Sequence, residues 1–400
     1  GVPEQPIGDL EARMEDAFEN ETTPAIAVAC RIQDGLMQSL VVQIVLCILY
    51  VAVFVVAVSG NLLVVYVVVR NKTMQTVTNI FITNLALSDL IVNFTSLWLT
   101  PTYTFVGQWI WGELLCHGLP LFQGMSIFIS TLTLMAIAVD RYLVIVRHSP
   151  TLNLGDHMSM TKCLIIIVFI WIVSLGLVLP YALHMRVLHI SRCGFDICSE
   201  DWSNTEFRSV YGTVVMVLQF VLPFTIIGIS YRRIWTFLAN RRWASERSIE
   251  TKRRKRLLSM LIIMVVVFAF CWFPFNTLNI LRDLKMDGIF RAHFTFFFLI
   301  VHLISMTATC WNPLVYAWMN ESFREEFVRA IPLLRSKFKS VSRVKMISEC
   351  QPAMQRKSCA DAPSCVSRVA RHSLPSKPYE TLLLTTEQPC VSSTSETTLL

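Results

Sequence analysis

The stretch "TLMAIAVDRYLVIV", Thr133–Val146, has only two charged residues, an acid and a base, Asp140 and Arg141, which stand side by side near its end. A charge in the hydrocarbon of a bilayer is costly, so a pair of opposite charges at the end of an apolar helix indicates a function. The rest of the chain also favours a membrane setting. Of its 400 residues, 54% are hydrophobic and 16% are charged, which is more apolar than a soluble core needs. We therefore expect an all-α membrane protein.

Seven segments are long and apolar enough to cross a bilayer, whose core of roughly 30 Å takes about 20 helical residues. They are Val41–Val69, Thr78–Val106, Leu114–Val146, Thr161–Leu183, Val210–Leu238, Leu257–Leu281 and Phe294–Trp318. The predicted fold class is a seven-transmembrane helix bundle. An odd number of spans does not divide into matching halves, which disfavours a transporter. A transporter or channel stays as the alternative class of protein.

Basic residues gather in one set of connections between these segments, while the N-terminal stretch is acidic. The basic positions are Arg70, Lys72, Arg147, Lys162, Arg232, Arg233 and Lys252–Arg256. Since cytoplasmic loops are rich in Lys and Arg, we expect a multi-pass plasma-membrane protein with an extracellular N-terminus. The net charge of +7 follows from this asymmetry and does not indicate nucleic-acid binding.

The expected organisation has three parts: an extracellular segment 1–38, a membrane domain 39–331 and a cytoplasmic tail 332–400. Asn20 begins an Asn-Glu-Thr sequence in the extracellular part, so it is a predicted glycosylation site. The tail is rich in Ser and Thr and lacks apolar periodicity, which predicts disorder and suits phosphorylation and arrestin docking. Its last three residues, Thr398–Leu400, fit a ligand of a PDZ-type domain.

Asp89 is the clearest acid inside a predicted span, and Asn61, Ser130 and Asn312 lie at comparable depth. These groups could hold a sodium ion, or each could only bond a neighbouring helix. The spans contain no pair of catalytic acids and no HExxH motif. We therefore expect no enzyme activity, no metal centre and no cofactor apart from a possible sodium ion at Asp89.

The predicted spans carry a series of distinctive markers. In chain order these are Asn61, Asp89, "DRY" at Asp140–Tyr142, Trp171, Pro223 with Tyr231, "CWFP" at Cys271–Pro274 and "NPLVY" at Asn312–Tyr316. From Gln38 to about Ile331 the chain resembles the rhodopsin-like G-protein-coupled receptors. The resemblance implies a heterotrimeric G protein as partner. It also implies a short amphipathic helix 8 at Asn320–Phe327, with Phe323 and Phe327 on its membrane-facing side.

In this family Arg141 would be held by Asp140 at rest and released when the sixth helix swings outward. The activation switch implied by the resemblance comprises Asp140, Arg141, Tyr142, Tyr231, Trp272, Pro274, Asn312, Pro313 and Tyr316. An acid that often stands at the inner end of the sixth helix is replaced by the basic run Arg253–Arg256, so its usual ion pair with Arg141 is not expected. The sodium site would consist of Asp89, Ser130 and Asn312.

Four cysteines, Cys30, Cys116, Cys193 and Cys198, lie on the expected outer side, and by themselves they could form two disulfides in three ways. The family resemblance implies a bond between Cys116 and Cys198. Cys193 would then pair with Cys30 or remain free.

Within the family the chain looks most like the neuropeptide Y and neuropeptide F receptors, including the short neuropeptide F branch, at Met74–Leu90 and Ser130–Val146. Ligands of those receptors end in Arg followed by an amidated Phe or Tyr. The matching pocket positions are Gln123, Gln219, Asn279, Asp283 and His302. A receptor for another class of peptide is the alternative.

The side chains at these positions suit such a peptide. Asp283 would pair with the ligand Arg, and the amides and His302 would hydrogen-bond the amidated terminus. Gln123 stands where an amine receptor would carry an Asp, and a neutral amide does not pair with an ammonium group. Glu200 and Asp201 would attract a cationic peptide. Two alternatives stay open, since Asp283 could be a solvated loop acid and His302 an interhelical donor.

Overall fold

The computed structural model describes residues 36–37, 39–147, 158–190, 194–240, 249–283 and 293–331. For residues 205, 240, 249–255 and 283 it describes the backbone alone. The chain divides into two units, Gly1–Ala330 and Ile331–Leu400, and every helix and strand named below belongs to the first. Several predicted positions lie outside the described residues: Asn20, Cys30, Cys193, the side chain of Asp283 and the tail 332–400.

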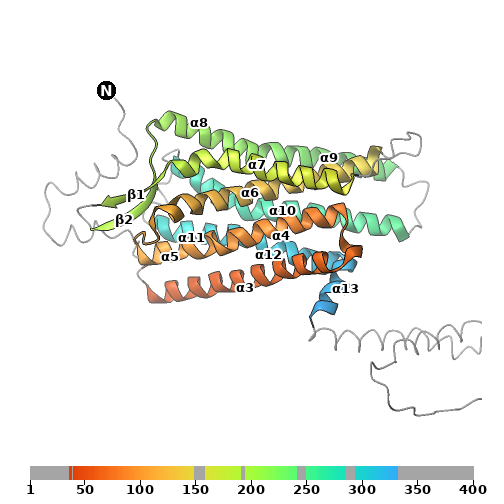
Figure 1. Ribbon diagram of the computed structural model, residues 1–400, viewed down its shortest axis with the longest axis horizontal. Helices are drawn as coiled ribbons and strands as arrows, with labels where there is room; N and C mark the ends of the chain where they lie inside the picture. The colour runs from red at the N-terminus through yellow and green to blue at the C-terminus, as the bar shows by residue number, and fades with distance from the viewer. Residues whose placement is uncertain are drawn as a thin grey trace, which may run out of the picture. The chain divides into compact units, whose positions relative to one another are not determined.

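Seven membrane-length helical segments lie side by side, with a two-stranded hairpin at one end of the bundle and a short helix at the other (Figure 1). The first four are α3 (Leu40–Arg70), α4 with α5 (Val77–Phe94, Ser96–Val106), α6 (Gly112–Tyr142) extended by the π-helical η2 (Leu143–Arg147), and α7 (Met160–Leu183). The last three are α8, η3 and α9 (Thr205–Met216, Val217–Val221, Leu222–Asn240), α10 (Ile249–Asp283), and α11 with α12 (Phe294–Met306, Ala308–Met319).

Short elements complete the described chain: η1 (Lys72–Met74), the antiparallel strands β1 (Met185–Ile190) and β2 (Phe195–Glu200), and α13 (Glu321–Ala330). Each predicted span falls on one of the seven long segments, so the predicted seven-helix bundle is confirmed.

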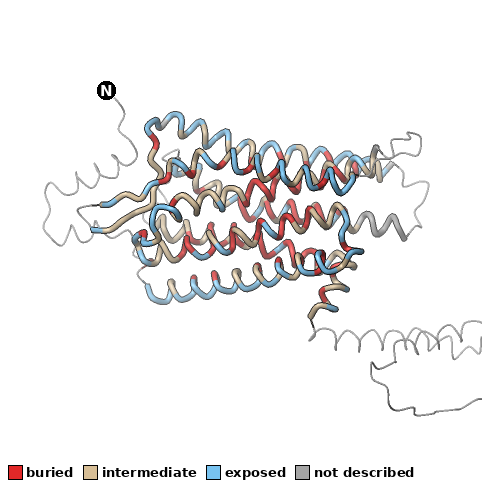
Figure 2. The backbone as a smooth tube through the Cα atoms, in the orientation of Figure 1, coloured by how far each residue is buried: buried red, intermediate tan, exposed pale blue. Residues whose placement is uncertain are grey.

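Buried residues follow the inner sides of the helices (Figure 2). The exposed sides carry large apolar residues such as Ile165, Phe169 and Phe270, whereas Asn61 and Asp89 are buried. This distribution suits a protein in lipid, because acyl chains solvate apolar side chains as well as a protein interior does. Apolar burial therefore does little to hold the helices together.

Polar contacts join the central helices. Asn84 of α4 donates from Nδ2 to Thr133 Oγ1 of α6 at 2.9 Å, and its Oδ1 accepts from Trp171 Nε1 of α7 at 2.8 Å. One amide thus connects three helices. Ser88 and Ser126 each donate a hydroxyl hydrogen to the backbone carbonyl of the other at 3.1 Å, which requires a close approach of α4 and α6.

Helix α13 corrects one expectation. Phe323 and Phe327 share one face of this helix, as their four-residue spacing predicts, but that face meets protein instead of membrane. Their side chains are buried, and the Phe323 ring stacks on Tyr316 of α12 with centroids 5.4 Å apart. Asn71, at the end of α3, donates to Glu326 at 2.8 Å. These contacts hold α13 against the bundle.

Gly60 provides a test of the close packing between α3 and α12. A Cβ added there would lie 2.9 Å from the Pro313 ring, which cannot move aside, whereas a Cβ on Gly176 of α7 meets no atom within 4 Å. We expect Gly60→Ala to lower the thermal midpoint of the purified protein, because overpacking costs about 1–3 kcal/mol. The matched Gly176→Ala variant should keep or raise it, since Ala in a helix gains about 0.5–1 kcal/mol over Gly. Equal shifts of both variants would contradict this packing.

Candidate functional site

A cavity of about 620 Å³ lies at the end of the bundle that carries β1 and β2, called here the hairpin end. Its walls come from six of the helical crossings, all except α3, and from the hairpin, and they are mostly aromatic and aliphatic, with Tyr181, Phe275 and Phe298 among them. A few polar side chains interrupt this lining. An apolar cavity of this size with a few polar groups is typical of a ligand-binding site.

Three of the five predicted ligand contacts line this cavity: Gln123 of α6, Gln219 of η3 and Asn279 of α10. Gln219 belongs to a π-helical turn for a local reason. Pro223 has no N–H to give to the carbonyl of Gln219, and the N–H of Leu222 bonds to Val217 in the wider i,i+5 pattern. Asp283 ends α10, and its side chain is outside the described residues.

His302 of α11 does not line the cavity but is buried one layer behind it. Its Nε2 is 3.2 Å from Ser96 Oγ, and its Nδ1 is 3.0 Å from the hydroxyl of Tyr50. Ser96 in turn donates to Gln123 Oε1 at 2.8 Å. Sequence reasoning missed Tyr50 and Ser96. Helical spacing could have placed both inside the bundle, since Tyr50 precedes Asn61 by about three turns and Ser96 follows Asp89 by about two.

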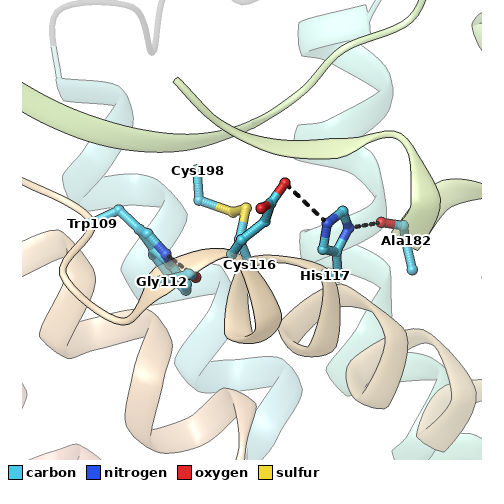
Figure 3. The surroundings of a disulfide bond; sticks show 7 residues. Trp109, Gly112, Cys116, His117, Ala182 and Cys198 are labelled. Carbon is cyan, nitrogen blue, oxygen red and sulfur yellow. Dashed lines mark hydrogen bonds and ion pairs between the residues drawn. A yellow bond between two sulfur atoms is a disulfide. The ribbon is translucent and has the colours of Figure 1, made fainter. Parts of the chain in front are cut away.

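The hairpin, which lines the cavity with Met185, Cys198 and Glu200, is covalently attached to α6 (Figure 3). Cys198 of β2 and Cys116 of α6 form the disulfide that the family resemblance implied. Beside it, His117 Nδ1 donates to the carbonyl of Ala182 at 2.7 Å, since a carbonyl can only accept. The hairpin and the start of α6 therefore form one unit.

Glu200, the last residue of β2, is the centre of an ion network at the cavity mouth. Its carboxylate accepts from Arg208 Nε at 2.9 Å and Nη2 at 2.6 Å, and from Trp202 Nε1 at 3.1 Å, while Arg282 Nη2 is 4.0 Å away. Burial raises the pKa of Glu200. The hydrogen bonds and charge of Arg208, the charge of Arg282 and the hydrogen bond from Trp202 lower the pKa by more than burial raises it, so the net pKa is below the ordinary value.

This network bears on the expectation that Glu200 and Asp201 attract a cationic peptide. Glu200 is paired with Arg208, and Asp201 lies 3.5 Å from Arg186. Both acids that were expected to attract a cationic peptide are thus engaged by basic residues of the protein itself. Their negative charge is largely compensated at short range, and Glu200 instead connects β2 to α8 and α10.

Asp89 is buried in the middle of the bundle and accepts from Asn312 Nδ2 of α12 at 2.9 Å. Ser130 is buried as well, but no hydrogen bond in the described part of the chain joins it to Asp89. Asn61 donates to the carbonyls of Ala57 and Thr309 instead of joining the acid. The Asp89 carboxylate, the Ser130 hydroxyl and the amide oxygen of Asn312 are hard oxygen ligands, the kind that an alkali cation prefers.

At the opposite end of the bundle, called here the Arg141 end, the Asp140 carboxylate accepts from Arg141, with Nε at 3.0 Å. The other predicted switch residues lie on four helices: Tyr142 ends α6, Tyr231 is buried in α9, Trp272 and Pro274 are in α10, and Asn312, Pro313 and Tyr316 are in α12. Trp272 meets the cavity-lining Phe275 edge to face, with centroids 5.8 Å apart.

A second ion pair at the Arg141 end was not predicted from the sequence. Arg256 of α10 donates to Glu321 of α13 at 2.6 Å and to the carbonyl of Trp318 at 3.2 Å. The basic run that removes the usual partner of Arg141 thus supplies a different contact, which joins α10 to α12 and α13. The side chains of residues 253–255 are outside the described residues.

Glu200→Gln tests the network at the cavity mouth. Because the folded-state pKa of Glu200 lies below its ordinary value of 4.5, the ionised side chain stabilises the fold at neutral pH. That stabilisation should be lost as the pH falls below about 4.5 through the folded-state pKa. We expect the variant to lose about 1.5–3 kcal/mol at pH 7, as for hydrogen bonds to a charged group.

The measurement is the thermal midpoint of both proteins between pH 7 and pH 3. The gap between wild type and Glu200→Gln should shrink at the acidic end, and a gap independent of pH would contradict the assignment. Asp201→Asn is the matched control, because this neighbouring acid is more exposed and pairs at a longer distance.

Comparisons with known proteins agree with this architecture. Residues 60–316 match the family described as "7 transmembrane receptor (rhodopsin family)". Neuropeptide Y receptor type 2 of Sus scrofa is 37% identical over 333 residues, which cover 80% of this chain and 85% of that protein. The receptors of that name from Homo sapiens and Gallus gallus are 38% and 35% identical, over 72% of this chain and 76% of each of theirs. Since the family match runs from α3 to α12, across the whole bundle, this chain belongs to the rhodopsin family of seven-transmembrane receptors.

Proposed function

We propose that this chain is a plasma-membrane receptor for an amidated neuropeptide of the neuropeptide Y or neuropeptide F type, signalling through heterotrimeric G proteins. One observation carries the proposal. In a chain 35–38% identical to neuropeptide Y receptors, three amide side chains, Gln123, Gln219 and Asn279, face a cavity of about 620 Å³. Amides can both donate to and accept from a terminal carboxamide. The hairpin end would face outward, with the N-terminus extracellular and Asn20 as a glycosylation site.

The rest of the ligand would be read at the cavity mouth. Asp283, which follows the cavity-lining Arg282 at the end of α10, would pair with the ligand Arg. His302 would act through Ser96 and Gln123, since these two hydrogen-bonded groups separate it from the cavity. From the sequence, we instead expected His302 to contact the ligand directly.

Transmission would run down α10. A ligand that displaces Phe275 moves the ring against which Trp272 packs, and Pro274 weakens the helix between them. Movement of the other end of α10 would separate Arg256 from Glu321 and let Arg141 exchange Asp140 for the G protein. Sodium held by Asp89, Ser130 and Asn312 would oppose this movement. Arrestin and a PDZ-type protein would bind the tail.

A peptide panel tests the proposed function. Membranes carrying the full chain would be incubated with peptides ending in Arg-Phe or Arg-Tyr, each as the amide and as the free acid. We expect saturable binding of amides that weakens when guanine nucleotide is added, because the nucleotide uncouples the G protein. Binding of unrelated peptides alone would favour another class of peptide. Ion current or solute flux in reconstituted vesicles without any peptide binding would favour a channel or transporter.

Arg256→Gln should raise signalling in the absence of ligand, because it removes the ion pair that holds α10 against α13. Both side chains are partly exposed, so the pair contributes about 0.2–1 kcal/mol and the rise should be at most about fivefold. The measurement is basal nucleotide exchange on the G protein at matched surface expression.

Arg329→Gln is the matched control, since Arg329 and Glu326 also lie 2.6 Å apart but both belong to α13. It should leave basal exchange unchanged. Reversing the pair, with Arg256→Glu and Glu321→Arg together, should restore low basal exchange. No rise in Arg256→Gln would show that the pair does not restrain α10.

A further inference from the structure

A continuous hydrogen-bond chain runs from the lipid-side helix α3 to the wall of the cavity. It passes from the Tyr50 hydroxyl to His302 Nδ1 (3.0 Å), from His302 Nε2 to Ser96 Oγ (3.2 Å), and from Ser96 Oγ to Gln123 Oε1 (2.8 Å). Tyr50, His302 and Ser96 are buried, and only Gln123 reaches the cavity. Four crossings of the bundle, α3, α5, α6 and α11, each supply one member.

The donation from Ser96 to Gln123, together with the number of hydrogens, gives the direction of this chain. Ser96 has one hydroxyl hydrogen and donates it to the Gln123 carbonyl, which can only accept. The contact between Ser96 and His302 must then use a hydrogen on His302 Nε2. A neutral imidazole has a single N–H, so Nδ1 is then an acceptor and shares the Tyr50 hydrogen with the Leu299 carbonyl, which is also 3.0 Å from the Tyr50 hydroxyl. The hydrogens of His302 Nε2 and Ser96 Oγ then both point toward Gln123.

This direction decides what Gln123 offers to a ligand. With its Oε1 engaged by Ser96, the amide turns its NH2 group to the cavity, where no side chain in the described part of the protein accepts from it. The opposite tautomer, with hydrogen on His302 Nδ1, would reverse each step. Tyr50 would donate to the Leu299 carbonyl, also 3.0 Å away, Ser96 would donate to His302, and Gln123 would turn its oxygen to the cavity.

We propose that His302 is a positioning residue whose Nε2-bound hydrogen, relayed by Ser96, fixes Gln123 as a hydrogen-bond donor toward the ligand. The ligand group that meets Gln123 is then an oxygen acceptor. This rests on the proposed function in one respect: for an amidated peptide, the acceptor is the carbonyl oxygen of the terminal carboxamide and not its NH2 group.

The tautomer can be measured without any ligand. The full chain, labelled with ¹⁵N-histidine and held in lipid bilayers, would be compared with its His302→Phe variant, so that the difference spectrum isolates one ring. We expect a neutral imidazole with hydrogen on Nε2. A signal for hydrogen on Nδ1, or for a doubly protonated ring, overturns the proposal even if no peptide binds.

Ligand discrimination provides the second measurement. The amidated peptide is compared with its terminal thioamide, in which sulfur, a weak acceptor, replaces the oxygen while the NH2 group and the neutral charge are kept. Wild type should prefer the carboxamide over this analogue by about three- to tenfold, the range of one hydrogen bond. Ser96→Ala should abolish the preference, because Gln123 is then free to turn. A merely structural role of Ser96 would weaken both ligands equally and would overturn the proposal.

Two variants complete the design. Ser174→Ala is the matched control, because Ser174 is also a buried serine but donates within its own helix, to Ile170 at 2.7 Å. It should retain the full preference. In a Gln123→Ala background, Ser96→Ala should cause no further loss of discrimination. If wild type binds no amidated peptide, the proposed function fails while the spectrum still decides the role of His302.

Discussion

Hydrogen bonding between side chains inside the membrane is the interaction on which this bundle depends. Acyl chains solvate an outward Phe270 as well as a helix neighbour would, so apolar contact alone does not select one arrangement of the helices. Selection comes from groups that lipid cannot satisfy. Asn84 uses both ends of its amide to join Thr133 and Trp171, and a one-turn shift of α4 would leave these polar groups unpaired. The hydrogen-bonded series from Tyr50 to Gln123 likewise joins several helices through a few directed polar contacts.

The seven spans could be read from the sequence because length and apolarity are local properties that a bilayer imposes on each helix. Contacts between segments far apart in the chain could not be read in this way. The spacing of Phe323 and Phe327 correctly placed them on one face, but nothing local said whether lipid or α12 would cover it. His302 was expected at the ligand. The pattern did not reveal that Ser96 stands between it and Gln123.

Ion pairs at the two ends of the bundle differ in burial, and this difference suits them to different roles. Glu200 and Arg208 are mostly buried, with 17% and 22% of their side chains exposed, so separating them would leave poorly solvated charges. Arg256 and Glu321 are 40% and 57% exposed, so water can replace each partner at little cost. The first pair is thus a fixed attachment of the hairpin, whereas the second can open and close during movement of α10.

Four buried polar atoms of the described residues have no hydrogen-bond partner: His293 Nδ1 at the start of α11, and Asn61 Oδ1, Trp272 Nε1 and Tyr316 Oη within the helices. An unsatisfied buried donor or acceptor costs about 1–3 kcal/mol, so this arrangement of α10 and α12 is not the best that these side chains could have. Trp272 and Tyr316 lie on the helices that carry Pro274 and Pro313, where the backbone ladder is already interrupted. A helix that bends at these prolines loses few backbone bonds, and it can gain a partner for an indole or a phenol. The cost of leaving the observed arrangement is therefore small, which is the condition for a ligand of modest differential affinity to shift it.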